Sequence, residues 1–426
     1  MFEFLMRLQG YNINKAYEEL VELGKLNFKE FETWQDKKKW EVSIYHYKNN
    51  DFYRKKVGKI FPKKWEDLPS LKKTDFQNSL DELLSNPFSS KNTYVANTSG
   101  SSGNPFTFAK DKDCHARTWA FWKMRYNDLG LSFSSKEARF FGHVTDYKTR
   151  IFEKIKDFVL KRHCFNVFDL SDNALNIFVK TFKRKKFDYI YGYTQTITIF
   201  AKYLIKKNII LKDICPSLKL VIVTAEICSE YDRKVIEEGF GIPVKDEYGS
   251  SETGYMASEC DYGNWHVVGE NIFIETNEKN EILVTDFFNL AQPFIRYNIG
   301  DLGVISSNSK CKCDNNNLIL SKFHGRTSDL IKLPNGKISP GLTFYYVSRN
   351  LLELYGIIKE FIVIQTHIDK FIFKIVSDIP INSNIEKELK NSMDKYLCAG
   401  LRFEIHKVDV INRPPSGKIK HFFSEL

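Results

Sequence analysis

The sequence lacks the long apolar segments that would carry a chain through a membrane. No window of its 426 residues approaches the ~18 consecutive apolar residues that a membrane-spanning helix needs. Residues 1–7 carry charges at Glu3 and Arg7 and have none of the basic region, apolar run and small-residue cleavage site of a signal peptide. The eight cysteines are spread from Cys114 to Cys398, which argues against a disulfide framework and for a reducing compartment. We therefore expect a cytoplasmic protein that is not inserted in a membrane.

The chain also has only a small excess of charge of one sign. It contains 63 basic and 53 acidic residues, a net charge of +10 with histidine neutral. Part of the excess lies in short clusters at residues 37–39 and 183–186, which are typical of solvated faces. A polyanion-binding patch is the alternative interpretation, and a nucleic-acid-binding protein would show binding that falls steeply with salt. Because the basic residues are diffuse, we expect no nucleic-acid partner.

What the sequence does contain favours an α/β protein. Hydrophobic residues make up 42% of the chain, enough for a large core, and the length suggests two or three domains. Residues 11–90 predict mostly amphipathic helices. Residues 218–224 form a β-branched run typical of a buried strand, and Thr194 is expected to cap a helix that runs to about Lys207. This alternation predicts a large α/β domain with mixed sheets, largely parallel, and a small β-barrel-like part.

The pattern changes after Asn271, where short strands replace the alternation of strands and helices. A smaller segment of different character follows Gly325. The expected elements are strands at residues 271–275, 281–286, 361–366, 371–377 and 403–411 and a helix at residues 383–397. We therefore predict an N-terminal domain over residues 1–326 and a small, mobile α+β domain over residues 327–426, with no internal repeat.

A small, hydroxyl-rich loop at residues 97–105 lies between apolar flanks. Its glycines let the backbone approach a ligand closely, and its hydroxyls and successive backbone N–H groups could wrap phosphate oxygens. It is not a Walker A loop, because no Gly-Lys-Ser/Thr follows, and a Gly/Ser turn alone is also typical of a plain loop. The loop residues that we expect to bind phosphate are Thr98, Ser99, Gly100, Ser101, Ser102 and Gly103.

Five motifs occur in order between residues 97 and 418. They are Thr98-Ser-Gly-Ser-Ser-Gly-Asn-Pro105, Tyr248-Gly-Ser-Ser-Glu252, Arg296-Tyr-Asn-Ile-Gly-Asp301, Gly325-Arg-Thr-Ser-Asp-Leu-Ile-Lys332 and Pro415-Ser-Gly-Lys418. Together they resemble the motifs of the acyl-adenylate-forming enzymes, which include acyl-CoA synthetases, luciferases and the adenylation domains of peptide synthetases. The resemblance covers nearly the whole chain.

This resemblance implies an enzyme that uses ATP to activate a carboxylic acid as an acyl-adenylate, with release of pyrophosphate. Since a carboxylate must attack the α-phosphorus of ATP, the site has to neutralise and align two anions. It implies that Glu252 holds Mg²⁺, a hard cation suited to carboxylate oxygens, and that Ser251 supplies the hydroxyl of the family's threonine. Lys418 is implied to reach the α-phosphate from the small domain. We expect Ser251, Glu252 and Lys418 to be catalytic residues.

The other motif residues are expected to bind the nucleotide. The resemblance implies that the Asp301 carboxylate accepts hydrogen bonds from the ribose hydroxyls and that Arg326 lies near the ribose or phosphate. The residues implied to lie near the adenine are Ala225, Glu226, Tyr248 and Gly249. Ser328 departs from the family, which often has Asp or Lys two residues after the hinge arginine. A serine can still act as a pivot for domain rotation.

Three cysteines and one histidine form a candidate metal set. Cys260 and His266, with Cys311 and Cys313, supply the thiolates and imidazole that suit tetrahedral Zn²⁺ in a closed structural site. Four unrelated residues are the alternative, since Cys-x-Cys is tighter than the usual zinc-finger spacing. The arrangement resembles the phenylacetate–CoA ligase branch, which has a Cys and a His after its Tyr-Gly-x-x-Glu motif and a Cys-x-Cys later. That likeness favours a structural zinc.

The same branch implies transfer of the acyl group to CoA to give a thioester. It also contains capsular-polysaccharide-type members, for which an amine acceptor is the alternative. Candidates for the acid pocket are Tyr193, His143 and Tyr248, although Tyr193 alone is also typical of a core tyrosine and His143 of a structural histidine. A non-catalytic nucleotide-binding relative is the remaining alternative, and the presence of Glu252, Asp301 and Lys418 argues against it.

Overall fold

The structure is a computed structural model of the 426-residue chain. It describes residues 2–98, 106–142, 154–306, 311–313, 315, 317–326, 330–341, 343–344, 347, 358–377, 380–412 and 420–426. Within these residues, no helix is both long and apolar enough to cross a bilayer.

The helices are mostly amphipathic and several begin at a polar capping residue. α3 begins after Asn27, whose side chain accepts from Glu30 N while Glu30 returns a bond to the Asn27 N–H, which satisfies two otherwise unpaired donors. Ser229 and Asp232 form the same capping box before α11. The described α-helices are α1 (Phe2–Leu8), α2 (Ile13–Leu23), α3 (Phe28–Asn49), α4 (Asp51–Val57), α5 (Leu80–Leu83), α6 (Lys112–Asp128), α8 (Asp172–Arg184), α9 (Thr194–Lys206), α10 (Leu211–Ile214), α11 (Glu230–Phe240) and α13 (Ser383–Tyr396).

The strands form one large sheet and three smaller ones. The strands are β1 (Leu71–Lys72), β2 (Tyr94–Asn97), β3 (Thr107–Lys110), β4 (Glu137–Phe140), β5 (Arg162–Cys164), β6 (Tyr189–Tyr193), β7 (Leu220–Thr224), β8 (Val244–Ser250), β9 (Gly254–Glu259), β10 (Trp265–Val267), β11 (Ile272–Thr276), β12 (Glu281–Asp286), β13 (Tyr297–Ser306), β14 (Ile319–Arg326), β15 (Leu330–Lys332), β16 (Ile338–Pro340), β17 (Ile358–His367), β18 (Lys370–Ser377), β19 (Arg402–Lys407) and β20 (Phe422–Ser424).

The large sheet has a parallel half and an antiparallel half. Its order is β11-β12-β13-β14-β10-β9-β8-β7-β6-β4-β5, and β1 pairs with β13 off this path. From β8 to β5 neighbouring strands are parallel, whereas β8 and β9 are antiparallel and the strands from β9 to β11 continue so. The two halves therefore meet at the β8–β9 hairpin, which carries the Tyr248–Glu252 motif.

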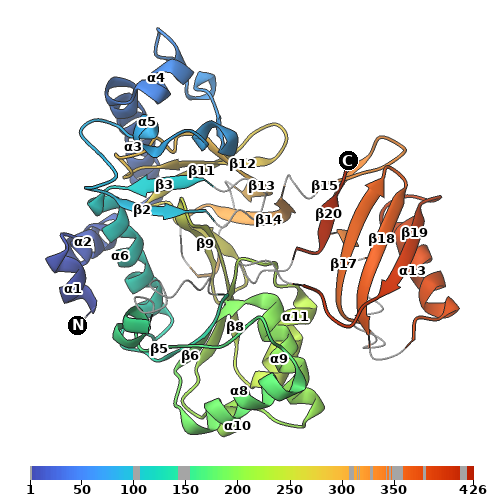
Figure 1. The fold of residues 1–426 in the computed structure, drawn as a ribbon. Helices are drawn as coiled ribbons and strands as arrows, with labels where there is room; N and C mark the ends of the chain where they lie inside the picture. Colours follow the sequence, from blue (N-terminus) through green and yellow to red (C-terminus); the bar gives the residue numbers. More distant parts are fainter. Residues whose placement is uncertain are drawn as a thin grey trace.

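Helices cover both faces of the parallel half (Figure 1). α8, α9 and α11 pack on one face, where their apolar side chains share a core with β4, β6, β7 and β8. α6 lies on the other face, where Tyr126 and Trp122 join the strand residues Tyr189, Tyr191 and Ile222. A sheet buried on both faces explains why residues 220–223 read as a continuous apolar run.

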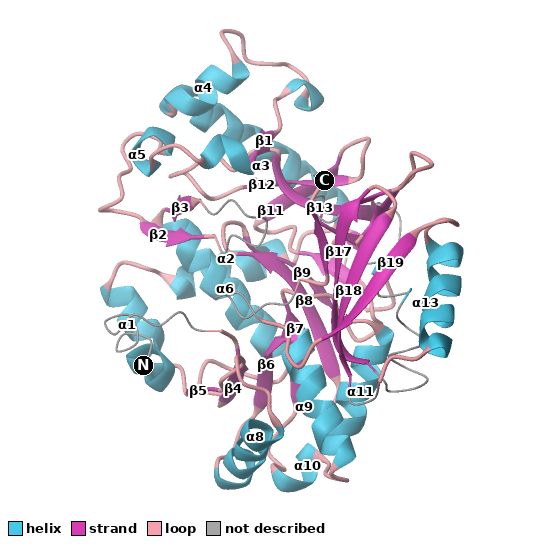
Figure 2. Ribbon diagram, turned by 45° about the vertical axis from the view of Figure 1, so that its right-hand side comes forward, coloured by secondary structure: helices cyan, strands magenta, loops and turns pink. Residues whose placement is uncertain are grey.

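A separate hydrophobic core lies in the C-terminal part, whose strands and helix α13 are drawn in Figure 2. The strands β19-β18-β17-β20 form a four-stranded sheet, and α13 supplies Ile385, Leu389 and Met393 to the core beneath it. All members of this core fall between residues 331 and 422. The domain boundary at residue 326 stays a prediction, because residues 327–329 lie outside the described part.

The predicted α/β fold class is confirmed, with corrections in detail. Residues 11–57 are mostly helical as expected, but residues 58–90 contain only short helical turns and β1. Thr194 does not cap α9: the cap position is Tyr193, which makes no capping bond, and Thr194 is the first helical residue. The strands where we expected a small barrel-like part form the antiparallel half of the large sheet. They are hydrogen-bonded to the parallel half as one continuous sheet.

Candidate active site

The β8–β9 turn holds Glu252 in a buried position. Ser250 Oγ accepts from Thr253 N at 3.1 Å and lies 2.9 Å from the Thr253 hydroxyl, which closes the turn. A side chain at Gly249 would meet the Gly254 carbonyl oxygen at 2.6 Å, so only glycine fits the close approach of the two strands there. Glu252 is 3% exposed, and Tyr297 donates to its Oε1 at 3.0 Å. Ser251, in contrast, is exposed.

Asp301 lies beside this turn at the same edge. Its register partner across β13 and β14 is Arg326, whose Nε lies 3.5 Å from Asp301 Oδ1. The Tyr248 hydroxyl donates to Asp301 Oδ2 at 2.7 Å. Burial raises the pKa of Asp301, while Arg326 and Tyr248 oppose that shift. Asp301 Oδ1 is buried and, beside its ion pair with Arg326, accepts no hydrogen bond from the described residues, which leaves acceptor capacity on this oxygen.

Lys73 is a member of this cluster that we did not predict. β1 pairs in parallel with β13, with Leu71 opposite Tyr297, so the turn that follows β1 places Lys73 beside the site. Burial lowers the pKa of Lys73, and the nearby carboxylates of Glu252 and Asp301 oppose that shift. The sequence gives no sign of this role, because Lys72-Lys73 resembles an ordinary pair of surface lysines. Only the pairing of β1 with β13 brings Lys73 to the site.

Arg296 has a different role from the other motif residues. Its backbone has a positive φ of 46°, and its Nε lies 3.0 Å from Glu275 Oε1. Its guanidinium also donates to the carbonyl oxygens of Glu66 and Leu68, both at 2.6 Å. Arg296 therefore ties the segment before β1 to β13, and it supports the placement of Lys73.

The expected phosphate loop lies in the sequence between two strands that pair as a hairpin. β2 and β3 pair directly on either side of it, with Asn97 opposite Thr107. Thr98 Oγ1 accepts from Phe106 N at 3.0 Å, and the backbone N–H of Thr98 donates to the Phe106 carbonyl. Thr98 therefore fixes the base of the loop. Ser99, Gly100, Ser101, Ser102 and Gly103 lie outside the described residues, as do His143, Ser328 and Lys418.

Ala225 and Glu226 follow β7 at the carboxyl edge of the parallel strands. Ala225 has a positive φ of 66°, which turns the chain toward α9. Glu226 Oε2 accepts from Gln195 N at 2.9 Å, so a residue distant in the sequence caps the start of α9. Tyr193 lies at this edge too, and burial together with Glu226 raises its pKa to about 12. Ligands of open α/β sheets bind at such strand ends.

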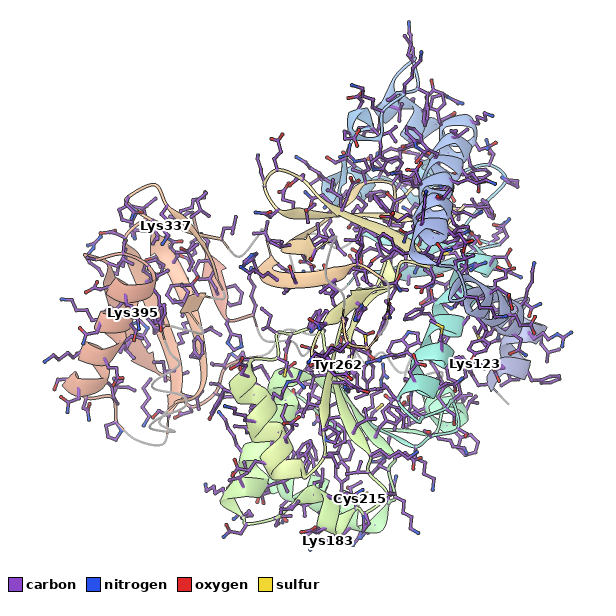
Figure 3. The ribbon with its side chains drawn as sticks, turned by 180° about the vertical axis from the view of Figure 1, so that it is seen from behind. Lys123, Lys183, Cys215, Tyr262, Lys337 and Lys395 are labelled. Carbon is purple, nitrogen blue, oxygen red and sulfur yellow. The ribbon has the colours of Figure 1, made fainter. Side chains whose placement is uncertain are left out.

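The four candidate metal ligands come together at the opposite end of β9. The Sγ atoms of Cys260 and Cys311 are 3.6 Å apart, and Cys313 Sγ lies 3.1 Å from His266 Nε2. All four ligand atoms lie within 4.8 Å of one another. His266 Nδ1 lies 3.4 Å from the carbonyl oxygen of Asn317, which orients Nε2 toward the sulfurs. Figure 3 shows the turn of this cluster, where Tyr262 is labelled.

The donor set fits tetrahedral zinc. Bonds of ~2.0–2.3 Å place the ligand atoms of such a site roughly 3.3–3.8 Å apart, close to the two separations above. The backbone N–H of Tyr262 and the Asn264 side chain donate to the sulfurs of Cys260 and Cys311. Such donors support thiolate ligands.

Comparisons with known proteins give matches in both sequence and fold. Residues 342–425 match the family described as "CapK C-terminal domain". The chain is also similar to Protein CapK of Staphylococcus aureus, with 23% identity over 425 residues that cover 94% of this chain and 90% of that protein.

Among solved structures, the chain is similar to 2-hydroxyisobutyryl-CoA ligase in its postadenylation state, with a TM-score of 0.70 and 16% identity over 94% of this chain and 91% of that one. The fold is that of the acyl-adenylate-forming ligases. The anthranilate CoA ligase AuaEII in complex with anthranoyl-AMP matches with a TM-score of 0.55 and 15% identity, over 76% of this chain and 65% of that one. The resemblance seen in the motifs, including the capsular-polysaccharide type, is thus confirmed.

Proposed function

We propose that this chain is an AMP-forming acid ligase that converts a carboxylic acid and ATP to an acyl-adenylate and pyrophosphate. The observation that carries the proposal is the cluster of Glu252, Asp301 and Arg326 with Lys73 at the junction of the two sheet halves. In this cluster Glu252 is a buried carboxylate that can hold a cation, and Asp301 is a buried hydrogen-bond acceptor. Arg326 and Lys73 add two cationic side chains at the same edge, next to the hairpin of the expected phosphate loop.

Each residue of the cluster has a task in that reaction. A carboxylate oxygen of the acid attacks the α-phosphorus, the new oxygen–phosphorus bond forms, and the bond to the β-phosphate oxygen breaks to release pyrophosphate. Asp301, held by Tyr248 and Arg326, would accept the ribose hydroxyls through its open oxygen. Lys73 would pair with a phosphate, and Lys418 would stabilise the charge that develops at the α-phosphorus.

Two metals fit side chains of this chain. Glu252 would hold Mg²⁺, because its carboxylate is a hard oxygen ligand fixed by Tyr297 beside the phosphate-binding edge. Bound there, Mg²⁺ neutralises phosphate charge. The Cys₃His cluster would hold a structural zinc, which leaves no open position for a substrate.

The acyl acceptor in this proposal is CoA, and the product is a thioester. Both ligases with solved structures are CoA ligases, which supports a thiol acceptor. The alternative is transfer to an amine with formation of an amide. The match of residues 342–425 to the CapK C-terminal domain favours it, because the capsular-polysaccharide-type members are the ones for which we consider an amine acceptor.

Two further points belong to the proposal. We place the domain boundary at residue 326, with rotation of the small domain between the two half-reactions. We also keep a cytoplasmic location, where the eight free cysteines would stay reduced.

The experiment that tests the proposal is ATP–pyrophosphate exchange against aryl, fatty, amino and uronic acids. We expect exchange that depends on one class of acid, followed by AMP release on addition of CoA or an amine. Tight binding of Mg-ATP without exchange for any acid would contradict an adenylating enzyme and favour the binding-only relative.

A further inference from the structure

A cavity of about 210 Å³ lies between α6 and the face of β4 and β6. Its walls are largely aromatic and include Trp122, Tyr126 and Tyr191. Pockets that take drug-sized ligands are usually 300 Å³ or more, so this one suits a compact molecule. Unlike an ordinary apolar pocket, it is also lined by Glu137, Arg139, Arg162 and Lys156.

Among the described residues that line this cavity, the charges do not balance. Arg139 Nη1 lies 2.6 Å from Glu137 Oε1, and Arg162 Nε lies 3.0 Å from Oε2 of the same carboxylate. Tyr189 adds a hydrogen bond of 2.8 Å to Oε2. One glutamate thus serves two arginines, and its side chain is 1% exposed while those of Arg139 and Arg162 are 20% and 11% exposed. The guanidinium groups of Arg139 and Arg162 are therefore more accessible from the cavity than the Glu137 carboxylate, which is more deeply buried.

Aromatic rings fix the orientation of Arg139. Its guanidinium carbon lies 4.4 Å from the ring centroid of Phe141 and 5.6 Å from that of Tyr191. Stacking on ring faces leaves the N–H edges of an arginine as its free hydrogen-bonding surface. Those edges match the planar fork of a carboxylate or the oxygens of a phosphate.

An aromatic contact links the wall of the cavity to the edge where the proposed adenylate forms. Phe141 borders the cavity, and its ring centroid lies 4.7 Å from that of Tyr193 at the end of β6. Helix α9 begins directly after Tyr193, and the Glu226 carboxylate accepts a hydrogen bond from the Gln195 N–H in its first turn. A molecule that reached from this edge past Tyr193 would meet Arg139 at its far end.

We infer that the acid activated by this chain carries a second anionic group, carboxylate or phosphate, which Arg139 and Arg162 bind in this cavity. The inference rests on the proposed function and names its substrate class. Fatty acids and unsubstituted aryl acids bring no second anion to these two arginines, which share the single carboxylate of Glu137, and are therefore poorer substrates.

The test compares matched acids in ATP–pyrophosphate exchange on the wild-type chain. Glutarate, adipate and isophthalate are each paired with their monomethyl ester, and 3-phosphoglycerate is paired with glycerate. We expect kcat/KM to favour one dianionic acid over its partner at least tenfold; the carboxylate and phosphate pairs reveal which anion is read. Equal exchange of both members of every active pair overturns this inference and leaves the proposed function intact. No exchange with any acid overturns both.

Variants of Arg139 test whether this residue binds the second anionic group of the substrate. Arg139→Gln removes the charge but keeps a polar side chain, and it should reduce the dianion preference about tenfold. Arg139→Lys, which keeps a cation for the ion pair with Glu137, should reduce it less. Arg233→Gln is the matched control, because Arg233 also pairs with a glutamate, at 2.6 Å, away from the cavity. Since the preference is a ratio measured within one variant, partial loss of folded protein does not change it. A preference unaltered in Arg139→Gln contradicts the assignment.

Discussion

The two ends of the antiparallel strands next to the parallel half carry opposite kinds of chemistry. β9 runs from the Glu252 turn to Cys260, a span of roughly 20 Å for six residues. The β13–β14 pair likewise runs from Asp301 and Arg326 at one end toward the segment of Cys311 and Cys313 at the other. One end gathers carboxylates and cations, and the other gathers thiols and an imidazole.

The difference between the charged end and the sulfur end shows how binding and structural support are divided between the two ends of the strands. At the charged end, hydrogen bonds from Tyr248 and Tyr297 fix the two carboxylates but leave acceptor capacity for a ligand. At the sulfur end, the four ligand atoms face one another and leave room for an ion alone. We expect the sulfur end to fix the register of the strands and the charged end to bind and react.

Removal of the lysine that we expect at the charged end should have the largest effect. Lys418→Ala is expected to reduce ATP–pyrophosphate exchange by about 1000-fold or more, because the charge that develops at the α-phosphorus loses its cation. ATP binding should change little. The matched control is Lys420→Ala, two residues away, which should exchange normally. Retention of acid-dependent exchange in Lys418→Ala would remove Lys418 from the mechanism.

Loss of a sulfur ligand should distinguish the structural role of the sulfur end from the binding role of the charged end. Cys311→Ser is expected to take the zinc content from about one equivalent per chain to near zero and to lower the melting temperature by ~5 °C or more. Elemental analysis and thermal melts measure both. Cys398→Ser, at a cysteine outside the cluster, is the control and should change neither. Wild-type protein purified without chelators and found free of zinc would show that the four residues form no metal site.

A smaller effect is expected at the cation that sequence reasoning missed. Lys73→Gln should weaken ATP binding about tenfold, since one phosphate contact is lost, while the melting temperature stays near that of the wild type. Isothermal titration with Mg-ATP measures the affinity. Lys72→Gln is the neighbouring control. Equal affinities for ATP in the two variants would place Lys73 outside the phosphate site.

The last effect is on stability rather than on ligand binding, and it concerns the carboxylate that precedes Tyr248. Burial raises the pKa of Glu247 to about 7, above its value near 4.3 in an unfolded chain. The folded state then binds more protons than the unfolded state between these values, so this group destabilises the fold as pH rises toward 7. Glu247→Gln should thus gain up to ~3 kcal/mol of relative stability between pH 4 and pH 8, measured by urea unfolding. A gain independent of pH would contradict the assignment.

The sequence was most informative where chemistry restricts both residue type and spacing. The Tyr248–Glu252 and Arg296–Asp301 motifs identified two candidate carboxylates, Glu252 and Asp301, and the structure brings them to one edge through β8, β9 and β13. The expected hairpin at residues 361–377 and the helix from residue 383 appear as β17, β18 and α13. Apolar periodicity identifies such elements well.

The sequence was least informative where strand pairing or long-range contacts decide the outcome. Lys73 joins the site only because β1 pairs with β13, more than two hundred residues later. The cap of α9 is Glu226 rather than the local Thr194, since a carboxylate from the end of β7 reaches the first N–H groups. The shared carboxylate of Glu137 likewise depends on the pairing of β4 with β5.

The central claim is that an acyl-adenylate forms at the charged end, and oxygen transfer tests it most directly. The chain would be incubated with ATP, the acceptor and an acid whose carboxylate carries ¹⁸O, and the nucleotide products would be weighed by mass spectrometry. Our account predicts AMP that carries one ¹⁸O atom, because the acid's oxygen bonds to the α-phosphorus. ADP with ¹⁸O in inorganic phosphate, or AMP without label, would contradict it.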